Sequence, residues 1–360
     1  NDDGIHGKEI WKSDGTAEGT VMLKDISPGS GSTSASCFCI SNGNMFFFVR
    51  DSQGYEQWWK SDGTTNGTVM TSNYGQQLYS YSLRPGQPTA YNSEIFFRMK
   101  SPDSDSYELF RLNNGSPQKV VDLIASQYEN EDVGYLTVHN NLLYFAACNG
   151  KIFKTTGTAE GTSLVKDLSP CTPKEFASAG NNLYFYASGK GYYHYPGDEL
   201  WTTDGTTEGT LMVKDINSNG SSDVKYVNAF KGTLYFFANS TEFGEELWRS
   251  KGTASTTTIV KDIFLGPSSS AGRLIAASNA LYFSATDPYH GRELWTSDGT
   301  PDGTKLVADI FPEEASSGPQ DFAVTPQFFC FTADDGVHGR ELWLIRTAEK
   351  TDSREWMRYR

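Results

Sequence analysis

Three histidines share a short motif that could carry acid–base or metal chemistry. His6, His290 and His338 each follow an aspartate by three residues and precede Gly, a basic residue and Glu. Histidine beside a carboxylate is a common general base and metal ligand. Equivalent turns of a repeated unit usually lie far apart, however, and Gly at this position indicates a tight turn. We therefore expect a structural role, with only His6 and His338 able to meet if the two ends of the chain come together.

Five glutamates precede an apolar–aromatic pair: Glu9, Glu199, Glu246, Glu293 and Glu341. They would suit a glycosidase only if two of them lay roughly 5–10 Å apart across one bond. Positions that recur once per repeated unit do not converge in that way. We expect these carboxylates to pair with a basic side chain or to accept a hydrogen bond from a turn amide, and we predict no catalytic residue.

Oxygen-rich Asp-Gly-Thr loops follow most of these aromatics and resemble fragments of calcium-binding loops. The Asp is replaced by Asn113, Thr156 and Lys251 in other copies, and no Glu completes a ligand set. Asp and Gly are also the residues that tight turns require. We expect turns rather than metal sites, and the sequence predicts neither a metal nor a cofactor. Motifs of serine hydrolases, zinc proteases and nucleotide-binding sites are missing from the sequence.

Asn-x-Ser/Thr sequons at Asn66, Asn114, Asn219 and Asn239 predict N-glycosylation on loops of a secreted protein. We expect Asn66 and Asn114 in turns, Asn219 in a linker and Asn239 just after a strand. Pro117, close behind Asn114, makes that sequon the poorer acceptor.

The five cysteines form no Cys-x-x-Cys pair. Cys148 ends an expected strand and Cys171 lies in the linker that closes the same unit, so both should emerge on one edge of it. We therefore predict a Cys148–Cys171 disulfide, worth about 3 kcal/mol in the chain-entropy model. The alternative is that all five are small buried thiols in a reducing compartment.

These motifs recur because almost the whole chain is a repeat. The segment Glu-Leu-Trp-Thr-Ser-Asp-Gly-Thr at 293–300 has close copies at 9–16 and 199–206, and most units are 47–48 residues long. A period of this size is typical of propeller blades. We expect the repeated aromatics to be core residues between units, the alternative being exposed rings that stack on sugars. They are Trp11, Trp59, Phe110, Phe153, Trp201, Trp248, Trp295 and Trp343.

Four short strands are predicted in each unit, as at 274–277, 281–285, 292–296 and 305–310. The second strand is apolar on both faces, so both must be covered. Neighbouring blades of a β-propeller provide that cover, whereas a two-sheet sandwich would show apolar–polar alternation. The expected fold class is therefore all-β, a single β-propeller over residues 1–346 followed by a charged C-terminal tail at 347–360.

The number of blades follows from pairing the predicted strands. The simplest ring has seven four-stranded blades. In it, the first and second strands of the last unit pair with the N-terminal hairpin 9–26, and this pairing removes the open sheet edges. Eight blades, one of them incomplete, is the alternative.

The repeat resembles the ELWxxDGT-repeat family. The match includes a second Gly-Thr, as in Gly303-Thr304, and Lys-Asp-Ile strand ends at 24–26, 214–216 and 261–263, and it covers the chain to about Arg346. The resemblance implies a secreted or surface-attached, β-propeller-like repeat protein with no general enzymatic role. It supplies no catalytic residues.

Charge narrows the possible partners. The chain has 44 acidic and 30 basic residues, a formal net charge of −14, which disfavours nucleic acid and anionic lipid. No apolar run is long enough to span a membrane. We expect an extracellular or cell-surface structural or adhesive module, not an enzyme, that binds other extracellular proteins or glycans in a larger assembly. A glycan-binding lectin is the alternative, and a polysaccharide-active enzyme is a more distant one.

Overall fold

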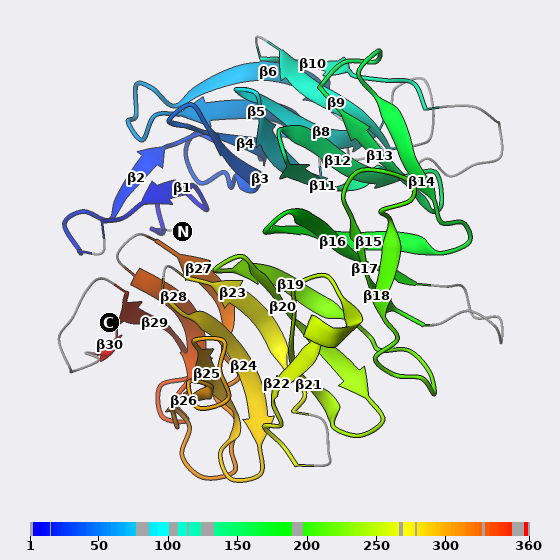
Figure 1. Ribbon diagram of the computed structural model, residues 1–360. Helices are drawn as coiled ribbons and strands as arrows, with labels where there is room; N and C mark the ends of the chain where they lie inside the picture. The colour runs from blue at the N-terminus through cyan, green and yellow to red at the C-terminus, as the bar shows by residue number, and fades with distance from the viewer. Residues whose placement is uncertain are drawn as a thin grey trace. The chain divides into compact units, whose positions relative to one another are not determined.

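Antiparallel β-strands dominate the computed structural model of the chain (Figure 1), and the described residues contain no α-helix. The described residues are 3–14, 16–76, 86–100, 107–113, 115–123, 133–188, 197–265, 269–277, 279–325, 328–347 and 356–358. Within them, no helix is long and apolar enough to cross a membrane.

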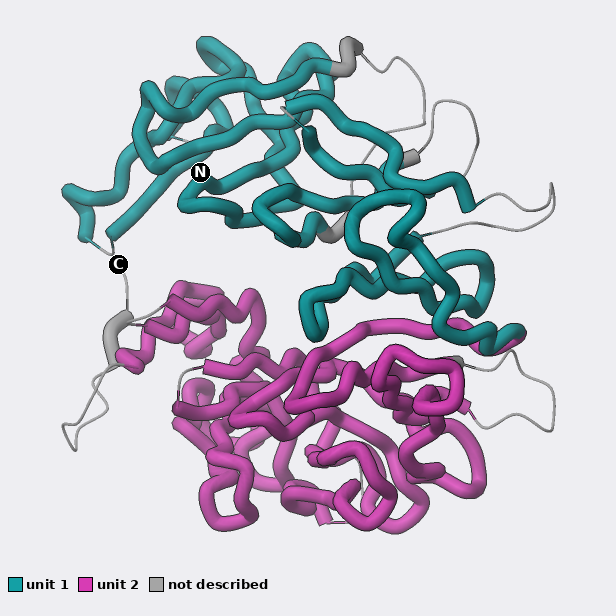
Figure 2. Tube along the Cα trace, turned by 45° about the horizontal axis from the view of Figure 1, so that its top comes forward, with its two compact units in different colours: residues 1–169 teal, residues 170–360 magenta. Residues whose placement is uncertain are grey.

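The chain forms two compact units, residues 1–169 and 170–360 (Figure 2). The first contains β1 (Ile10–Lys12), β2 (Val21–Lys24), β3 (Ser34–Ser41), β4 (Asn44–Arg50), β5 (Tyr55–Ser61), β6 (Val69–Gln76), β7 (Gly86–Tyr91), β8 (Glu94–Lys100), β9 (Tyr107–Asn113), β10 (Ser116–Lys119), β11 (Gly134–His139), β12 (Leu142–Ala147), β13 (Lys151–Thr155) and β14 (Ser163–Asp167). The second contains β15 (Thr172–Ala179), β16 (Asn182–Ser188), β17 (Glu199–Thr203), β18 (Leu211–Lys214), β19 (Lys225–Phe230), β20 (Thr233–Ser240), β21 (Gly244–Ser250), the 3₁₀ turn η1 (Ala254–Thr256), β22 (Thr258–Lys261), β23 (Gly272–Ala276), β24 (Leu281–Asp287), β25 (Gly291–Ser297), β26 (Lys305–Ala308), β27 (Gln320–Val324), β28 (Phe328–Asp334), β29 (Arg340–Arg346) and β30 (Trp356–Arg358).

One sheet topology repeats in both units. In the part of the chain that the structure describes, seven sheets have four strands each, paired in chain order, and the sheet β1–β2 has two. The first strands of successive sheets contact one another: β3 with β7 and β7 with β11 in one unit, and β15 with β19, β19 with β23 and β23 with β27 in the other. Successive sheets therefore pack face to face, in the order of the chain.

The second strand of most four-stranded sheets is buried on both faces, as its sequence predicts, whereas in β28 only alternate residues are buried. In β20, Phe237 packs against Phe283 of the following sheet. The alternate residue Phe236 packs in a different cluster with Tyr184 of the preceding sheet. Both phenylalanines are 0% exposed, and burying each is worth about 1.5–3 kcal/mol. The two faces of one strand thus hold three sheets together.

A β-bulge recurs in the first strand. At a register shift in six of the described sheets, one residue other than glycine adopts a left-handed conformation: Cys37, Tyr135, Glu175, Tyr226, Arg273 and Asp321. Bulges of this kind bend and twist a strand. The Glu175 carboxylate accepts a hydrogen bond from the amide of Tyr226, 3.1 Å away, and so joins the bulges of neighbouring strands.

The ends of the chain differ from the prediction. The third strand of the last sheet, β29, pairs with β30, so the C-terminal tail expected outside the repeat supplies a fourth strand. The N-terminal hairpin forms the separate sheet β1–β2 and does not complete the last sheet. A segment roughly ten residues downstream closes a far shorter loop than a hairpin from the other end of the chain, so its entropic cost is lower. Seven complete sheets and one half-sheet fit the seven-blade and eight-blade counts equally.

Candidate functional site

Four of the repeated glutamates, Glu9, Glu199, Glu246 and Glu293, connect their sheet to the linker that follows it. The Glu199 carboxylate accepts hydrogen bonds from the amides of Ile216 and Ser222, each at 3.1 Å, and from the Ser222 hydroxyl at 2.6 Å. Glu246 and Glu293 accept equivalent bonds from linker amides. The predicted bond to a turn amide is confirmed, and these carboxylates hold the fold together.

Burial changes the acidity of these glutamates. Glu199 and Glu246 are 0% exposed, and this burial raises the pKa of each to about 7. Burial also raises the pKa of Glu293 above its usual value. A perturbed pKa in a cleft would suggest catalysis, but here each raised pKa belongs to a buried structural carboxylate.

The Asp-Gly-Thr loops are closed hydrogen-bond networks. Asp298 accepts bonds from the amide and the hydroxyl of Thr300, at 2.9 and 2.6 Å, and these bonds lower the pKa of Asp298. The second glycine, Gly303, lies directly against this carboxylate, because a Cβ there would sit 2.0 Å from Asp298 Oδ1. Ser297 and Thr304 hydroxyls are 2.7 Å apart at the base of the loop. The predicted turn role is confirmed; among the described residues, no cluster of three or more His, Cys, Asp or Glu could hold a metal.

The three histidines also belong to turns. His290 Nδ1 lies 2.8 Å from Asp287 Oδ2, and the His290 amide donates to Asp287 Oδ1. His6 pairs with Asp3, and His338 with Asp335, in the same way. The hydrogen bond to Asp287 raises the pKa of His290. Each histidine thus stabilises its own turn, as predicted.

The repeated aromatics are only partly core residues. Phe110, Trp248 and Trp295 are buried. The five others are half-buried: Trp11, Trp59, Phe153, Trp201 and Trp343. The fully buried position is the residue just before the aromatic, because that side chain faces the neighbouring sheet, as in Leu200, Leu247 and Leu294.

The predicted disulfide is absent. Cys148 and Cys171 take part in no disulfide bond. Cys148 is 3% exposed and packs in the apolar cluster between the sheets β7–β10 and β11–β14, so its thiol faces a neighbouring sheet and not the linker.

The sequons occupy different environments. Asn66 and Asn219 are exposed on loops, whereas Asn239 is half-buried and lies within β20, opposite Glu245, not after the strand. Asn114 lies outside the described residues. Glycosylation itself stays a prediction.

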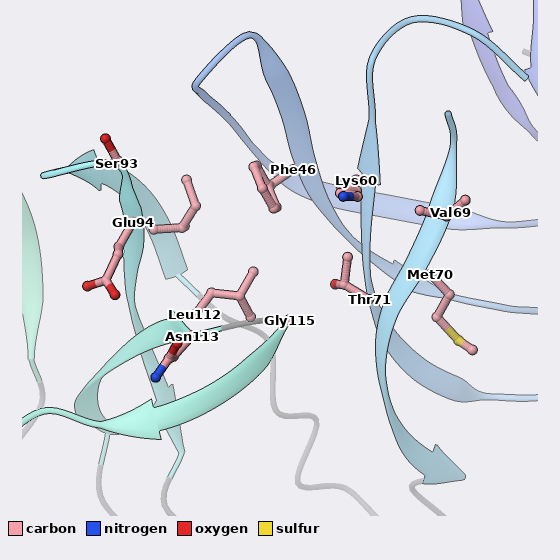
Figure 3. Close-up of a pocket in the computed structure, with 11 residues that line it drawn as sticks. Phe46, Lys60, Val69, Met70, Thr71, Ser93, Glu94, Leu112, Asn113 and Gly115 are labelled. Carbon is pink, nitrogen blue, oxygen red and sulfur yellow. The ribbon is translucent and has the colours of Figure 1, made fainter. Parts of the chain in front are cut away.

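A pocket of about 560 Å³ lies between the sheets β3–β6 and β7–β10 (Figure 3). One wall is a row across the first sheet, in which Phe46 pairs with Lys60 and Lys60 with Val69. In Figure 3, Phe46 and Leu112 point into the space between the two sheets. The residues that line the pocket are Phe46, Lys60, Val69, Met70, Thr71, Ser93, Glu94, Ile95, Leu112, Asn113 and Gly115.

The pocket exists because the repeat is broken at this point. In the other four-stranded sheets as far as β26, the third and fourth strands are joined by a full loop, as at 298–304 between β25 and β26. Only 114–115 separate β9 from β10. In the complete repeat, Gly299 of this loop lies against Tyr235 of the preceding sheet, since a Cβ there would be 2.1 Å from the Tyr235 hydroxyl. The short turn leaves the equivalent ring, Phe46, without that cover.

Burial shows the consequence for Phe46. In five other four-stranded sheets the equivalent residue, which pairs with the residue after the repeated aromatic, is a ring that is at most 8% exposed: Phe96, Tyr144, Tyr184, Tyr235 and Tyr282. In the last sheet this position holds Cys330, so Phe46 is the one ring of the six that is half-buried. The pocket therefore presents an aromatic ring that the repeat elsewhere covers.

The two charged side chains that line the pocket differ, because one is paired with another residue and one is not. Glu94 is paired with Arg111, whose Nη1 is 3.4 Å from its carboxylate. The Lys60 ammonium group has no hydrogen bond or ion pair with any residue in the described part of the chain. The pocket thus offers an apolar floor, an amide at Asn113 and one cation whose charge is not neutralised.

A second pocket, of about 430 Å³, lies in the other unit between the sheets β15–β18 and β19–β22. Its cation, Lys214, donates to the carbonyl of Thr257 at 3.1 Å and lies 5.5 Å from the centre of the Trp248 ring. Because this ammonium group already has protein partners, the pocket between β3–β6 and β7–β10 is the stronger candidate.

From the sequence, we noted in this region only that Asn113 replaces the Asp of the loop. The missing Asp-Gly-Thr at 113–115 and the shorter unit that contains it were the available signal. A local break in an otherwise consistent repeat is where a functional site is expected.

Comparison with known proteins shows the fold. No family model matches the chain, and no curated protein matches it. The chain is similar to a prolyl endopeptidase structure, with a TM-score of 0.59, 12% identity, and coverage of 91% of this chain and 50% of that one. It is also similar to the β-propeller domain of the Trilobed protease from Pyrococcus furiosus, with a TM-score of 0.51, 9% identity, and coverage of 91% and 97%. Puromycin hydrolase gives a TM-score of 0.51 at 12% identity, with coverage of 87% and 52%. The fold is a β-propeller, and the chain spans about half the length of the endopeptidase and the puromycin hydrolase.

These similarities correct the function predicted from the sequence. A structural or adhesive module, a lectin and a polysaccharide-active enzyme were the expected classes. The structures that share the fold over most of this chain are instead a prolyl endopeptidase, a protease and a hydrolase. For the Trilobed protease, the matching part is its propeller domain.

Proposed function

We propose that this chain is the non-catalytic propeller domain of a peptidase-type hydrolase and that it holds a segment of a peptide in the pocket between β3–β6 and β7–β10. The observation that carries the proposal is the half-buried Phe46 at the break in the repeat. The similarity to peptidase and hydrolase structures supports the class of partner domain and ligand.

The outer wall of the pocket suits an extended peptide. Val69, Met70 and Thr71 begin β6, the fourth strand of its sheet, and no strand among the described residues pairs with its outer edge. An exposed edge strand can bind a peptide through main-chain hydrogen bonds, while alternate side chains enter pockets. Val69 is 39% exposed and lies in the same row as Phe46 and Lys60, so its side chain is accessible to such a ligand.

The test is peptide binding by calorimetry with a matched pair of variants. Val69→Asp places a negative charge in the row that contains Phe46 and Lys60 and should weaken binding at least tenfold. Leu211→Asp makes the same kind of change at the equivalent position of β18, where Leu211 is 56% exposed and lies outside the pocket, and should bind as the unchanged protein does. Equal losses in both variants, or no binding of any peptide, would contradict the proposal.

Membership of the ELWxxDGT-repeat family and an extracellular or cell-surface location also stay proposals. The repeated loops and glutamate ties support the first, because they give each motif residue a structural role. The exposed sequons at Asn66 and Asn219 support the second. Intact-mass measurement of the protein from its native source would show whether carbohydrate is attached.

A further inference from the structure

We infer that Lys60 binds a carboxylate, so that the pocket selects the C-terminal end of a peptide whose last side chain is apolar. This inference rests on the proposed function, because it names the part of the peptide that enters. It follows from the hydrogen bonds that the basic residues equivalent to Lys60 make in intact repeats.

In intact repeats, the basic side chain at the position of Lys60 donates a hydrogen bond to another part of the protein. Lys12 donates to the carbonyl of Gly63 at 2.8 Å, and Arg249 donates to the carbonyl of Gly299 at 3.0 Å. In both cases the acceptor is the glycine of the Asp-Gly-Thr loop in the next sheet. The short turn between β9 and β10 replaces that loop beside Lys60, and the Lys60 ammonium group has no bonded partner among the described residues. The break in the repeat therefore leaves the Lys60 ammonium group without a protein acceptor, as it leaves the Phe46 ring without cover.

The surroundings favour an anion at Lys60. Its neighbours across the sheet, Phe46 and Val69, are apolar. The one carboxylate that lines the pocket, Glu94, is paired with Arg111. A half-buried ammonium beside apolar groups forms charge-assisted hydrogen bonds that are stronger than neutral ones.

The floor favours an apolar side chain attached to that anion. Ile95 and Leu112 line the pocket and are 2% and 7% exposed, and Leu112 points into the same space as Phe46 in Figure 3. In a peptide, only the last residue carries a carboxylate and a side chain on the same Cα. A pocket of about 560 Å³ is also of the size that binds small ligands and peptide ends.

The experiment titrates short peptides ending in leucine, as free acids and as C-terminal amides, into the full chain. Amidation should weaken binding to the unchanged protein about tenfold or more, the difference expected for one charge-assisted hydrogen bond. In Lys60→Met the acid and the amide should bind equally, whereas Lys60→Arg should restore part of the preference. Lys305→Met removes one positive charge from an exposed residue of β26, outside the pocket, and should keep the full preference.

The outcomes separate this inference from the proposed function. If acids and amides bind the unchanged protein equally, the carboxylate role of Lys60 is wrong and peptide binding stands. If no peptide binds but N-acetyl-leucine binds and depends on Lys60, the carboxylate role stands and the proposed function is wrong. If neither binds, both are wrong.

Discussion

Single residues in this protein have roles that their type alone does not reveal. A glutamate beside a tryptophan, repeated along the chain, resembles a catalytic set. The hydrogen bonds of Glu199, Glu246 and Glu293 show that each of these three holds a linker against its own sheet. The sequence could predict that the repeated carboxylates would not converge, but not that these three would be 0% exposed, because burial depends on the neighbouring sheet.

The raised pKa values give a pH dependence of stability. In the folded state the pKa of Glu199 rises from 4.5 to about 7, so the folded protein binds this proton more tightly than the unfolded chain does. Its contribution to the free energy of unfolding is therefore greatest at low pH and decreases as the pH rises from 4.5 to 7. The raised pKa of His290 acts in the same direction, since its stabilisation is lost as the pH rises through the folded value.

Glu199→Gln should reduce this pH dependence and lower stability. The amide has one oxygen to accept the bonds that both carboxylate oxygens accept, and its NH₂ group faces donors, so the loss should be about 1–3 kcal/mol. Urea unfolding between pH 5 and pH 8 measures both effects. Glu208→Gln, at an exposed loop glutamate, is the control and should keep the original slope. A slope in Glu199→Gln equal to that of the control would show that Glu199 does not titrate in this range.

At the scale of elements, the loop between the third and fourth strands decides where the repeat is closed and where it is open. The sequence predicts the four strands, the turn residues and the two-sided burial of the second strand, because these follow from local pattern and period. It does not predict the bulges in the first strand. Cys37, Tyr226 and Arg273 are not residues that usually adopt left-handed conformations, and packing between sheets imposes that geometry.

The loop itself can be tested at its second glycine. Gly303→Ala would bring a Cβ to 2.0 Å from Asp298 Oδ1, so the carboxylate must move and lose its bonds to Thr300. We expect a loss of about 1–3 kcal/mol in unfolding free energy. Gly220→Ala is the matched control, because its nearest neighbour would be 3.9 Å away, and it should change stability by less than about 1 kcal/mol. Similar losses in the two variants would contradict the packing described for this loop.

A complete loop should also close the pocket. Replacing 113–116 with the sequence of 298–304 should give Lys60 a carbonyl partner and cover Phe46. Peptide affinity should then fall at least tenfold, with no loss of unfolding free energy. The same sequence placed at 204–210, where a full loop already joins β17 and β18, should leave binding unchanged. A grafted protein that still binds peptide would show that the break in the repeat does not create the site.

For the whole molecule, a regular sequence specified the β-propeller, and its irregularities specified the site. The fold could be predicted because each unit repeats the same apolar pattern, and the strand pairing shows it in seven four-stranded sheets of the described chain. The strand pairing at the C-terminal end could not be predicted, because β30 lies in a segment without the repeat motif. The pocket could not be predicted either. It depends on a missing loop, and the missing loop leaves Phe46 and Lys60 of the preceding sheet uncovered.

The central claim is that peptide binds where the repeat is broken, and methyl NMR of the chain labelled at its valines and leucines tests it most directly. Val69 lines the pocket, whereas Val21 and Leu211 occupy the equivalent positions of β2 and β18. On titration with an unlabelled leucine-ending peptide, we predict a saturable shift of the Val69 methyl signals, with those of Val21 and Leu211 unchanged. A shift at Val21 or Leu211 with Val69 unchanged, or no shift at saturating peptide, would contradict the account.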